Sequence, residues 1–330
     1  MSYHLSDYDY ALPPELVASR PVERREDSRM LVLHRESGRM EHRFFKDLPE
    51  YIAQEDLLVL NDSKVLPARL HDVLGKVEML LVKKQDETHW IAMVKPGRKM
   101  RPGNMVTVGD VEITVQEILP DGMRLLTLSQ PLDLERWGEM PIPSYFKREA
   151  DAEDCERYQS VFARDPGSVA APTAGLHFTK GILQTLPHTF LTLHVGPGTF
   201  LPVKTENILE HTMHREEYQI SAATAVQLND FYQSEKRGRL IAVGTTTVRV
   251  LESQPEGPIL PHMGATNIFI RPPYQFQRVD ALLTNFHFPK STLLMLISAL
   301  AGRETILETY RTAVKQGYRF YSYGDCMLIL

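Results

Sequence analysis

The sequence predicts a multi-domain α/β protein, in which a small antiparallel β-barrel is inserted into a layered α/β domain. After residue 133, strand-like runs alternate with helical ones, as in α/β layers. Between residues 65 and 129, short β-like runs follow one another with turn signals between them and no helical period. The 330 residues also exceed what one hydrophobic core usually needs. We therefore expect a discontinuous catalytic domain of residues 1–64 and 140–330, and a barrel of residues 65–139.

The N-terminal part carries two strand signals. Residues 30–45 read MLVLHR, then Glu-Ser-Gly, then RMEHRFF, which predicts a β-hairpin with its turn at the glycine. Residues 56–60, DLLVL, form a short apolar run that is typical of a buried strand. Both segments belong to the α/β domain.

The predicted barrel consists of short runs rich in β-branched and aliphatic residues. They are VEMLLV (77–82), HWIAMV (89–94), MVTV (105–108), VEITV (111–115) and RLLTL (124–128). Pro-Gly, Gly-Asp and Asp-Gly pairs stand between most of these runs and mark turns. Such closely spaced strands indicate a small antiparallel barrel.

After the barrel, candidate helices and candidate strands alternate along the chain. The candidate helices are residues 175–186, 221–236, 246–252 and 291–315, the last broken near Gly302. The candidate strands are TFLTLHV (189–195), RLIAVG (239–244), NIFI (267–270) and ALLTNF (281–286). The longest apolar run, residues 292–301, is too short to span a bilayer and predicts a buried helix.

Composition limits the compartment and the partners. The N-terminal residues are polar and acidic, without the apolar segment of a secretory signal, and the two cysteines show no CxxC spacing. We therefore expect a reduced, cytoplasmic protein. The net charge of −5 argues against indiscriminate nucleic-acid binding, although residues 83–101 carry a local net charge of +4. By charge alone, that stretch indicates either a solvated β-surface or a nucleic-acid contact.

Polar or small residues follow several strand-like runs at the point where each run ends. They are NDSK (61–64) after DLLVL, HVGPGT (194–199) after FLTL, GTTTVR (244–249) after LIAV, and TNFH (284–287) after DALL. In open α/β sheets, the loops that leave the carboxyl ends of the strands gather at one edge and form the ligand site. The sequence therefore predicts that these segments meet.

The segment GTTTVR places hydroxyls where a helix is expected to begin. Thr245 or Thr246 would cap that helix, and its free N–H groups would favour an anion or a carboxylate. Plain helix capping without a ligand is the alternative. The spacing of a Walker loop is absent, and Gly196 and Gly198 give only part of a dinucleotide fingerprint.

Histidines offer the main titratable groups. His177 ends the segment SVAAPTAGLHF (168–178), which is otherwise small and apolar, and His287 stands between two phenylalanines. Each alone fits a structural histidine as well as a catalytic one, but several on adjacent loops favour catalysis. His211 and His214 are three residues apart and would share a helix face, so a metal ligand pair is an alternative to hydrogen bonding there.

Long blocks of the sequence closely resemble one enzyme family. The blocks are NDSKVLPARL (61–70), MPIPSYFKR (140–148), SVAAPTAGLHF (168–178), LHVGPGTFLPV (193–203), AVGTTTVRVLES (242–253), TNFHFPKSTLLMLISALAG (284–302) and YRFYSYGDCMLIL (318–330). The chain is similar, nearly end to end, to the S-adenosylmethionine:tRNA ribosyltransferase-isomerases of the queuosine pathway. The resemblance implies transfer and isomerisation of the ribosyl part of S-adenosylmethionine onto 7-aminomethyl-7-deazaguanine at the tRNA wobble position. The implied products are epoxyqueuosine-tRNA, adenine and methionine.

The resemblance also implies the partners. S-adenosylmethionine would be consumed as a substrate, so that neither a resident cofactor nor a metal is expected, and the other partner would be the tRNA. We expect a monomer and no membrane association. Two rivals remain: a hydrolase of S-adenosylmethionine or of nucleosides that does not act on RNA, and a tRNA-binding module without activity.

The resemblance implies three kinds of role for the candidate site residues. A sulfonium acidifies the C5′ hydrogens, so a general base could form an ylide, and His177 is the first candidate, with small residues before it to admit the ribose. The other acid–base candidates are His194, His287 and Asp325. The candidates for binding S-adenosylmethionine are Thr173, Gly175, Gly196, Gly198, Thr199, Gly244, Thr245, Thr246, Thr247, Arg249 and Asn285. The candidates for the deazaguanine and the tRNA are Asn61, Asp62, Arg69, Lys83, Lys84, Lys95, Arg98, Lys99 and Arg101.

Overall fold

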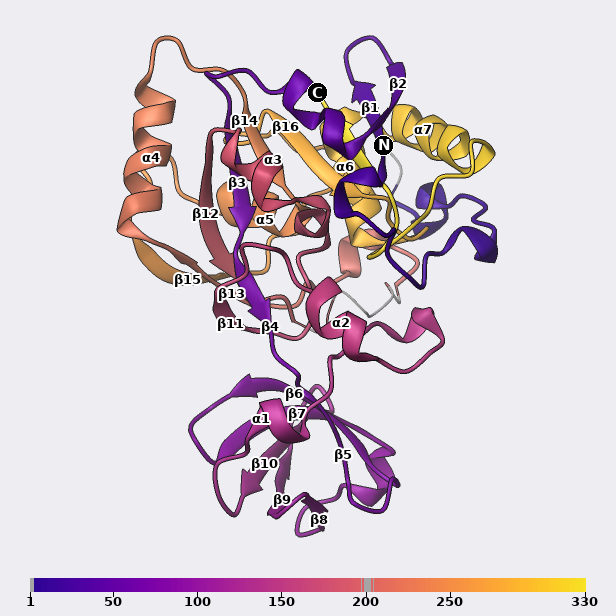
Figure 1. Cartoon of the computed structure of the whole chain (residues 1–330), viewed down its shortest axis with the longest axis vertical. Coiled ribbons are helices and arrows are strands. Elements are labelled where there is room, and N and C mark those ends of the chain that lie inside the picture. The colour runs from indigo at the N-terminus through magenta and orange to yellow at the C-terminus, as the bar shows by residue number, and fades with distance from the viewer. Residues whose placement is uncertain (1–2, 197, 199–202, 204) are drawn as a thin grey trace.

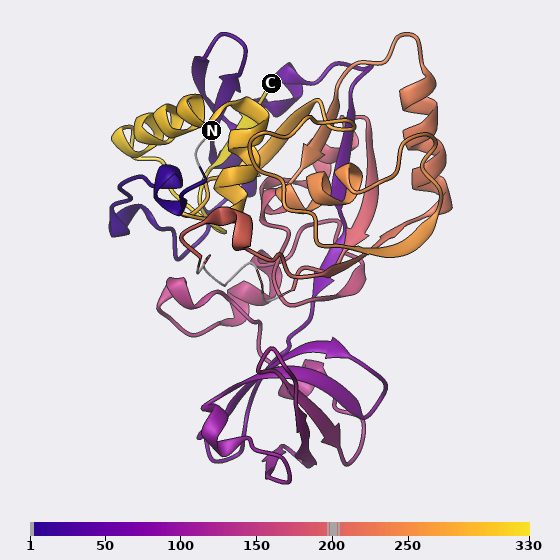
Figure 2. The same cartoon turned by 180° about the vertical axis from the view of Figure 1, so that it is seen from behind.

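The computed structural model describes residues 3–196, 198, 203 and 205–330. It has two lobes, which Figures 1 and 2 show from opposite sides. The larger lobe holds a nine-stranded mixed sheet with helices on its faces, and the smaller lobe is a six-stranded antiparallel sheet curled into a barrel. The expected fold class, an α/β domain with an inserted antiparallel barrel, is confirmed.

The large sheet has the strand order β15-β13-β12-β3-β14-β16-β17-β1-β2. Strands β12, β3, β14 and β16 run parallel, and β17 is antiparallel to β16. The bounds are β1 Arg29–His34, β2 Arg39–Phe44, β3 Leu57–Asn61, β12 His188–Leu193, β13 Glu216–Ile220, β14 Leu240–Val243, β15 His262–Thr266, β16 Ala281–Asn285 and β17 Cys326–Ile329. A separate parallel pair joins β4 (Ser63–Val65) to β11 (Asp165–Ser168).

The central strands of the large sheet are buried on both faces, and they are apolar at successive positions rather than at alternate ones. In β3, Val59 points to one core, whereas Leu58 and Leu60 point to the other. Strand β1 divides its residues in the same way, with Leu31 and Leu33 on the first face. This is why DLLVL reads as a continuous apolar run.

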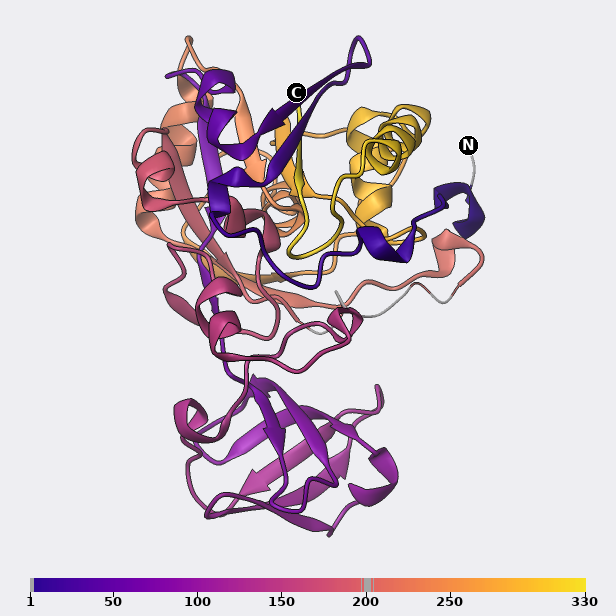
Figure 3. The ribbon, with the colours of Figure 1, turned by 45° about the vertical axis from the view of Figure 1, so that its right-hand side comes forward.

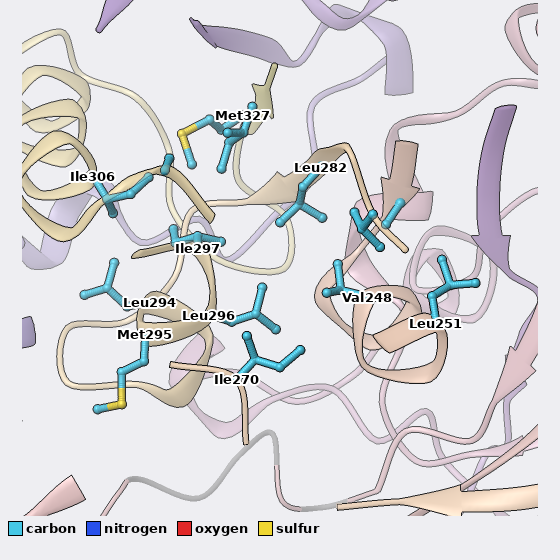
Figure 4. Close-up of a cluster of buried hydrophobic side chains, with 14 of the residues drawn as sticks. Val248, Leu251, Ile270, Leu282, Leu294, Met295, Leu296, Ile297, Ile306 and Met327 are labelled. Atoms are coloured by element: carbon cyan, nitrogen blue, oxygen red, sulfur yellow. The ribbon is translucent and has the colours of Figure 1, made fainter. Parts of the chain in front are cut away.

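Helices cover the first face of the sheet. They are α4 (Ala222–Gln233), α5 (Thr245–Glu252), α6 (Thr292–Ala301) and α7 (Arg303–Lys315). Figure 3 shows α6 and α7 beside the C-terminal strands, and Figure 4 shows side chains of α5, α6 and α7 meeting Leu282 and Met327 of the sheet. Gly302, with φ of +84°, separates α6 from α7, so the predicted break is confirmed.

The second face of the sheet is covered by shorter elements. Here α3 (Lys180–Gln184) and two 3₁₀ segments, η4 (Phe45–Tyr51) and η7 (Thr173–His177), pack on the sheet. The remaining short helices are α1 (Leu134–Trp137), α2 (Ala152–Arg157), η1 (Leu5–Tyr8), η2 (Pro14–Leu16), η3 (Arg25–Asp27), η5 (Gly97–Lys99), η6 (Ser144–Phe146) and η9 (Ile208–Glu210).

The barrel has the strand order β5-β6-β7-β10-β9-β8. The bounds are β5 Arg69–His71, β6 Glu78–Lys84, β7 His89–Lys95, β8 Met105–Val108, β9 Val111–Ile118 and β10 Arg124–Leu128. The Val73 N–H donates to the carbonyl of Thr107 at 2.9 Å, which links the segment after β5 to β8 and helps to close the barrel. The five predicted runs are all strands; β5 was not predicted because three residues leave no readable period.

Two sequence-based expectations for the C-terminal part are wrong. NIFI (267–270) is not a strand; the edge strand β15 lies just before it. Residues 175–186 are not one helix, because Phe178 is extended and Thr179 starts α3 by accepting the Ile182 N–H at 3.3 Å. Propensity alone does not place such a boundary.

The two lobes are joined where β4 leads into β5 and where the chain returns after α1. The backbones of Arg69 and Glu139 form an isolated antiparallel bridge there. A cluster that includes Val65, Ile142 and Phe146 fills the junction. The exact domain boundaries, at 64/65 and 139/140, remain predictions.

The segment that returns from the barrel is fastened by one buried carboxylate. Asp154 accepts from both terminal nitrogens of Arg148, at 2.6 and 2.8 Å, and from the Tyr323 hydroxyl at 2.8 Å. Burial would raise the pKa of Asp154, but these donors and the Asp151 N–H hold the pKa at about 2. The carboxylate therefore ties α2 to the C-terminal loop.

We expect Asp154→Asn to remove an acid-dependent part of the stability. Because the pKa of Asp154 is about 2 in the folded protein, below its ordinary value, the ionised carboxylate adds roughly 2 kcal/mol to the free energy of unfolding above pH 4. This contribution is lost as the pH falls towards 2. Urea unfolding of the wild type and the variant at pH 7 and at pH 3 would measure this loss. Asp133→Asn is the control, since Asp133 only caps α1 and asparagine caps as well. An equal pH dependence in wild type and Asp154→Asn would contradict the assignment.

In the part of the chain that the structure describes, no helix combines the length and the apolar character that a membrane crossing requires.

Candidate active site

One edge of the large sheet collects the predicted loops. Strands β3, β12, β14 and β16 are parallel, so their carboxyl ends, including Asn61 and Asn285, lie at the same edge. Because β17 is antiparallel to β16, with Cys326 opposite Asn285, its N-terminal end lies there too. Strand β1 is parallel to β17 and begins at this edge. This topology makes the edge the natural ligand site.

Contacts between the loops confirm that they meet. Ser63 lies 2.8 Å from Nδ1 of His194, and the Val195 N–H donates to Ser168 at 2.8 Å. A side-chain carbon at Gly244 would lie 3.7 Å from Cβ of Ala174, so α5 begins beside η7. The segments that follow β3, β12 and β14 therefore lie around one edge together with the segment of His177.

His177 lies at this edge, beside the residue that precedes β1. Its side chain is 5 % exposed, its Nδ1 lies 2.7 Å from Oγ of Ser28, and its ring packs against Phe45 at 5.4 Å between centroids. Burial lowers the pKa of His177 to about 4; the side chain of Asn285 raises it, and the charges of two arginines lower it. The ring is therefore neutral at physiological pH. No hydrogen bond of ordinary geometry reaches its Nε2 among the described residues, although the Asn285 side chain is close enough to the ring to raise the pKa through a hydrogen bond.

The small residues before His177 serve packing. A side-chain carbon at Gly175 would come within 2.9 Å of the Phe162 ring, so any larger residue there would require that ring to shift. Gly175 and Ala174 are buried. Thr173, at the start of η7, is half-buried. Packing within the protein thus explains why the residues before His177 are small, in addition to any role that they have towards a ligand.

His287 and Asn285 follow β16. His287 is 7 % exposed, its Nε2 lies 3.0 Å from the Thr284 hydroxyl, and burial lowers its pKa to about 3. The Asn285 amide donates to the carbonyl of Tyr321 at 3.0 Å, while its Oδ1 has no partner in the described structure. The Asn285 side chain lies close to the His177 ring, whose pKa it raises, whereas His287 is held by Thr284.

His194 and Asp325 complete the acid–base candidates. His194 is half-buried, and burial lowers its pKa although three nearby carboxylates act in the opposite direction. Asp325 is 2 % exposed, and its two oxygens accept the backbone N–H groups of Arg29 and Arg319, each at 2.8 Å. Burial raises the pKa of Asp325 despite these donors. Asp325 is engaged with the backbone at both oxygens, so the geometry favours a structural role.

The first turn of α5 offers donors. Gly244 is its N-cap with φ of +89°, and no side chain caps the helix, so the expectation that Thr245 or Thr246 caps it is wrong. Thr247 donates to the carbonyl of Val243 at 2.9 Å instead. The Thr246 hydroxyl is buried without a partner in the described residues. Free N–H groups and this hydroxyl together suit a carboxylate.

The position of Arg249 does not favour its predicted role in binding S-adenosylmethionine. Its side chain is buried and forms an ion pair with Glu216 of β13, which is buried as well. The other oxygen of Glu216 accepts the Gly196 N–H at 3.2 Å. Arg249 therefore holds the loop after β12 through Glu216, and its guanidinium already has a carboxylate partner.

Asn61 and Asp62 are also used within the fold. The Asn61 side chain bonds both the N–H and the carbonyl of Leu193, which joins β3 to β12. Asp62 accepts from Thr192 at 2.7 Å and pairs with Arg164 at 2.6 Å; burial nevertheless raises its pKa. Both residues shape the edge, and their roles towards the deazaguanine remain predictions.

The loop after β12 is only partly described. Gly198 packs so closely on His214 that a side-chain carbon would lie 2.7 Å from its ring, whereas Thr199 lies outside the described residues. His214 stands in an irregular segment, not on the helix face that was predicted for it and His211. Among the described residues, no three His, Cys, Asp or Glu side chains come together as a metal site would require.

The basic stretch of the barrel divides into two groups at opposite ends of one hairpin. Lys83 pairs with Glu217 of the large sheet and Lys84 pairs with Glu87, so this end lies beside the loop of His194. Lys95 lies opposite Glu78 at the far end, roughly 20 Å away along the strand. Arg98, Lys99 and Arg101 follow it on the surface. Arg69 lies at the junction, where it contacts Glu78 and donates to the carbonyl of Ile142 at 2.9 Å.

The sequence reasoning missed several residues of this edge. Ser28 stands just before β1, where nothing in the local pattern distinguishes it from a turn serine. Tyr321 has φ of +72°, unusual for a non-glycine residue, and packs with Tyr145 at 5.1 Å. A cavity of about 20 Å³ beside His177 is lined by Pro21, Val22, Arg25, Ser28, Arg157, Leu176, His177, Ser322, Tyr323 and Gly324. The motif YSYGD (321–325), which is part of the resemblance, is the signal in the sequence that points to Tyr321.

The fold and the geometry together define an α/β protein of the class in which ligands bind beside the carboxyl ends of adjacent parallel strands. The chain belongs to the queuosine biosynthesis protein family, whose model matches residues 5–329. It is 48 % identical over 345 residues to an S-adenosylmethionine:tRNA ribosyltransferase-isomerase of Moorella thermoacetica, with 99 % of each chain covered. It is 46 % identical over 339 residues to the enzyme of that name from Thermotoga maritima, again covering 99 % of each.

A solved structure agrees with these relatives. The crystal structure of S-adenosylmethionine tRNA ribosyltransferase from Thermotoga maritima is similar with a TM-score of 0.56 and 38 % sequence identity. The match covers 98 % of this chain and 100 % of that one. Both lobes therefore fall within the likeness.

Proposed function

We propose that this protein is an S-adenosylmethionine:tRNA ribosyltransferase-isomerase. It transfers the ribosyl part of S-adenosylmethionine to the aminomethyl group of 7-aminomethyl-7-deazaguanine at the tRNA wobble position and isomerises it to epoxyqueuosine, releasing adenine and methionine. The likeness to enzymes of this name over 99 % of the chain carries the proposal. A substrate of this kind places the enzyme in the cytoplasm, and one chain supplies all the segments of the edge, so we take the monomer as the active unit.

Different residues of the edge have different roles in the proposed reaction. The sulfonium of S-adenosylmethionine acidifies its C5′ hydrogens, and the neutral His177 ring offers Nε2 as the base. The first turn of α5, with the Thr246 hydroxyl, holds the carboxylate of the methionine part. Because S-adenosylmethionine is itself consumed, the reaction needs neither a resident cofactor nor a metal.

The tRNA lies across both lobes in this proposal. The wobble nucleotide leaves its stack to reach the sheet edge, as in other enzymes that modify a base. Lys83 and Lys84 are already paired with carboxylates, whereas Lys95, Arg98, Lys99 and Arg101 are exposed at the far end of the barrel hairpin. The far group is therefore the better candidate for phosphate contacts along the anticodon arm.

We expect Arg98→Ala and Lys95→Ala to weaken tRNA binding and to lower the slope of log Kd against log salt by about one per lost contact. Lys236→Ala, an exposed lysine of the larger lobe after α4, is the control and should leave both quantities unchanged. Filter binding from low to moderate salt would measure them. If neither far variant changes the slope, the far group does not contact phosphate.

The proposed function is tested by incubating the protein with S-adenosylmethionine and a tRNA that carries 7-aminomethyl-7-deazaguanine, followed by nucleoside mass spectrometry. A nucleoside with the added mass of the epoxycyclopentanediol group is expected. Adenine release without a change in the RNA would instead favour the hydrolase. Binding of tRNA with neither product would favour a module without activity.

A further inference from the structure

Three aromatic side chains from distant parts of the sequence meet beside the carboxyl edge of the large sheet. They are Tyr145 of η6, Phe288 after β16 and Tyr321 in the loop before β17. The centroid of the Tyr145 ring lies 5.2 Å from that of Phe288 and 5.1 Å from that of Tyr321. The rings of Phe288 and Tyr321 are also in contact. This aromatic cluster therefore joins the return from the barrel to two loops of the sheet edge.

The aromatic cluster adjoins the surroundings of His177. The Tyr145 hydroxyl lies 2.6 Å from Oγ of Ser322, and Ser322 and His177 line the same small cavity. The Asn285 side chain donates to the carbonyl of Tyr321 at 3.0 Å. Figure 1 shows β3 running towards the barrel, so this edge of the sheet faces the smaller lobe. A substrate that spans both lobes and reaches His177 therefore passes the aromatic cluster.

One ring of the aromatic cluster is exposed. Tyr321 is 5 % exposed and Tyr145 is half-buried, whereas Phe288 is 38 % exposed. A single exposed phenylalanine is ordinary on a protein surface. The backbone and the charges around Phe288 therefore have to decide whether its ring serves a ligand.

The backbone is held in an unfavourable conformation in all three segments of the aromatic cluster. Among the described residues other than glycine, positive φ angles occur at Lys147 (53°), Lys290 (58°) and Tyr321 (72°). Lys147 stands two residues after Tyr145, and Lys290 stands two residues after Phe288. Non-glycine residues in this region are strained, and such residues concentrate at functional sites and ligand clamps. Strain in three segments that meet at one place favours a ligand site over incidental packing.

The charges beside the aromatic cluster fit an anionic ligand. Arg148 pairs with the buried Asp154, and Lys290 pairs with Asp9 at 2.9 Å. Lys147 is exposed and forms no ion pair with any described residue. An exposed aromatic ring beside an unpaired cation matches a nucleotide in a single strand, whose base stacks while its phosphate meets the ammonium group.

We propose that the aromatic cluster binds an unpaired base of the tRNA anticodon loop next to the wobble nucleotide. The base stacks on Phe288, and Lys147 contacts a phosphate of the same strand. This inference rests on the proposed function, which supplies the tRNA and brings the wobble nucleotide to His177. When that nucleotide leaves its stack, the neighbouring base loses a stacking partner, and the Phe288 ring replaces it. The adenine of S-adenosylmethionine is enclosed with its substrate, whereas an exposed ring suits a strand whose backbone stays outside.

Fluorescence tests the stacking directly. Two anticodon stem-loops carry 2-aminopurine, one on each side of the wobble nucleotide, since the emission of this base is quenched when it stacks. At saturation with the full-length wild type we expect quenching at one of the two positions. Phe288→Leu should relieve that quenching, and Phe288→Tyr should keep it. Equal emission with the wild type and Phe288→Leu at both positions would overturn the proposal.

The salt dependence of the affinity separates the ring from the cation. We expect Phe288→Leu to raise Kd for the stem-loop at least about 5-fold, the smallest loss for one base–aromatic stack, without changing the slope of log Kd against log salt. Lys147→Ala should lower that slope by about one. Phe44→Leu is the matched control: Phe44 is 45 % exposed but ends the edge strand β2, with Lys46 over its ring.

The binding of S-adenosylmethionine without RNA distinguishes the two bases that could stack on Phe288. We expect calorimetry to give the same affinity for the wild type and Phe288→Leu. A loss of this affinity at unchanged Kd for the stem-loop would assign the ring to adenine and overturn the proposal. Thermal unfolding of each variant shows whether the fold is intact, which an exposed side chain should leave nearly unchanged.

The outcomes separate this proposal from the proposed function. A folded Phe288→Leu protein that binds the stem-loop as the wild type does would overturn the stacking and leave the reaction in place. A wild type that forms no modified nucleoside would overturn the proposed function, and the fluorescence would still decide the stacking. A wild type that does not bind the stem-loop would overturn this proposal as well.

Discussion

Replacing His177 with alanine is expected to lower kcat for ribosyl transfer by about 10²- to 10⁴-fold, the usual contribution of a general acid or base. The reason is geometric: His177 has an imidazole nitrogen that is buried at the sheet edge and that no hydrogen bond of ordinary geometry reaches in the described structure. Single-turnover formation of the modified nucleoside would measure the loss. Binding of S-adenosylmethionine, followed by calorimetry, should change little if His177 acts on the chemical step.

The control for this variant is His188→Ala. His188 starts β12 at the opposite edge of the sheet, is half-buried, and bonds the Leu186 carbonyl at 2.8 Å, so it matches His177 in residue type but not in place. We expect it to keep near-normal turnover. A His177→Ala protein that stays folded and turns over normally would remove His177 from the chemistry.

The pH dependence offers an independent check of the same site. A folded-state pKa of about 4, below the ordinary value near 6.5, means that the unfolded chain binds a proton more readily between these values. The burial of His177 therefore reduces the stability as the pH falls from about 6.5 to 4. In His177→Gln, the free energy of unfolding should depend less on pH between about 4 and 6.5. The pH profile of wild-type turnover should show no fall near pH 6.5 that arises from protonation of His177, a fall that is called the acid limb below. A limb at 6.5 that disappears in the variant would contradict the burial of the ring.

Local patterns predicted most of the fold because the sheet and the barrel are made of short apolar runs with turns between them. The hairpin of β1 and β2, the strand DLLVL and the break at Gly302 were all readable in this way. Strand β17 was not predicted although a Gly-Asp pair stands just before it, since an apolar run as short as MLIL does not distinguish a strand from a segment of a buried helix. The failure at NIFI has a similar cause: an apolar run of four residues does not reveal whether a neighbouring strand will pair with it.

The site was predicted as a location more accurately than as a set of roles. The rule that strand-end loops gather at one edge depends only on strand direction, so it held for Asn285, Gly244 and His177. Roles depend on partners that are distant in the sequence. Arg249 meets Glu216, and Asp325 meets two backbone N–H groups, neither of which a local pattern shows. Ser28 acquires its place only when β1 pairs with β17.

Removing Arg249 is expected to lower the free energy of unfolding by about 3–5 kcal/mol, because it leaves the carboxylate of Glu216 buried and unpaired. Few single changes in this chain should cost as much, since a protein of this kind is stable by only about 5–15 kcal/mol. Urea unfolding of Arg249→Met would measure the effect. Arg311→Ala is the control: its ion pair with Glu308 lies on the surface, and its loss should cost less than about 1 kcal/mol.

A double-mutant cycle decides between the two roles considered for Arg249. If its partner is Glu216, then Arg249→Met and Glu216→Leu each destabilise strongly, and the double variant recovers much of the loss because no unpaired charge remains. If its partner is the carboxylate of S-adenosylmethionine, Arg249→Met raises KM for that substrate at nearly unchanged stability. The structure favours the first result, since both side chains are buried against each other. Because Glu216 also receives the Gly196 N–H, its loss should further loosen the loop beside His194, so that stability and turnover fall together.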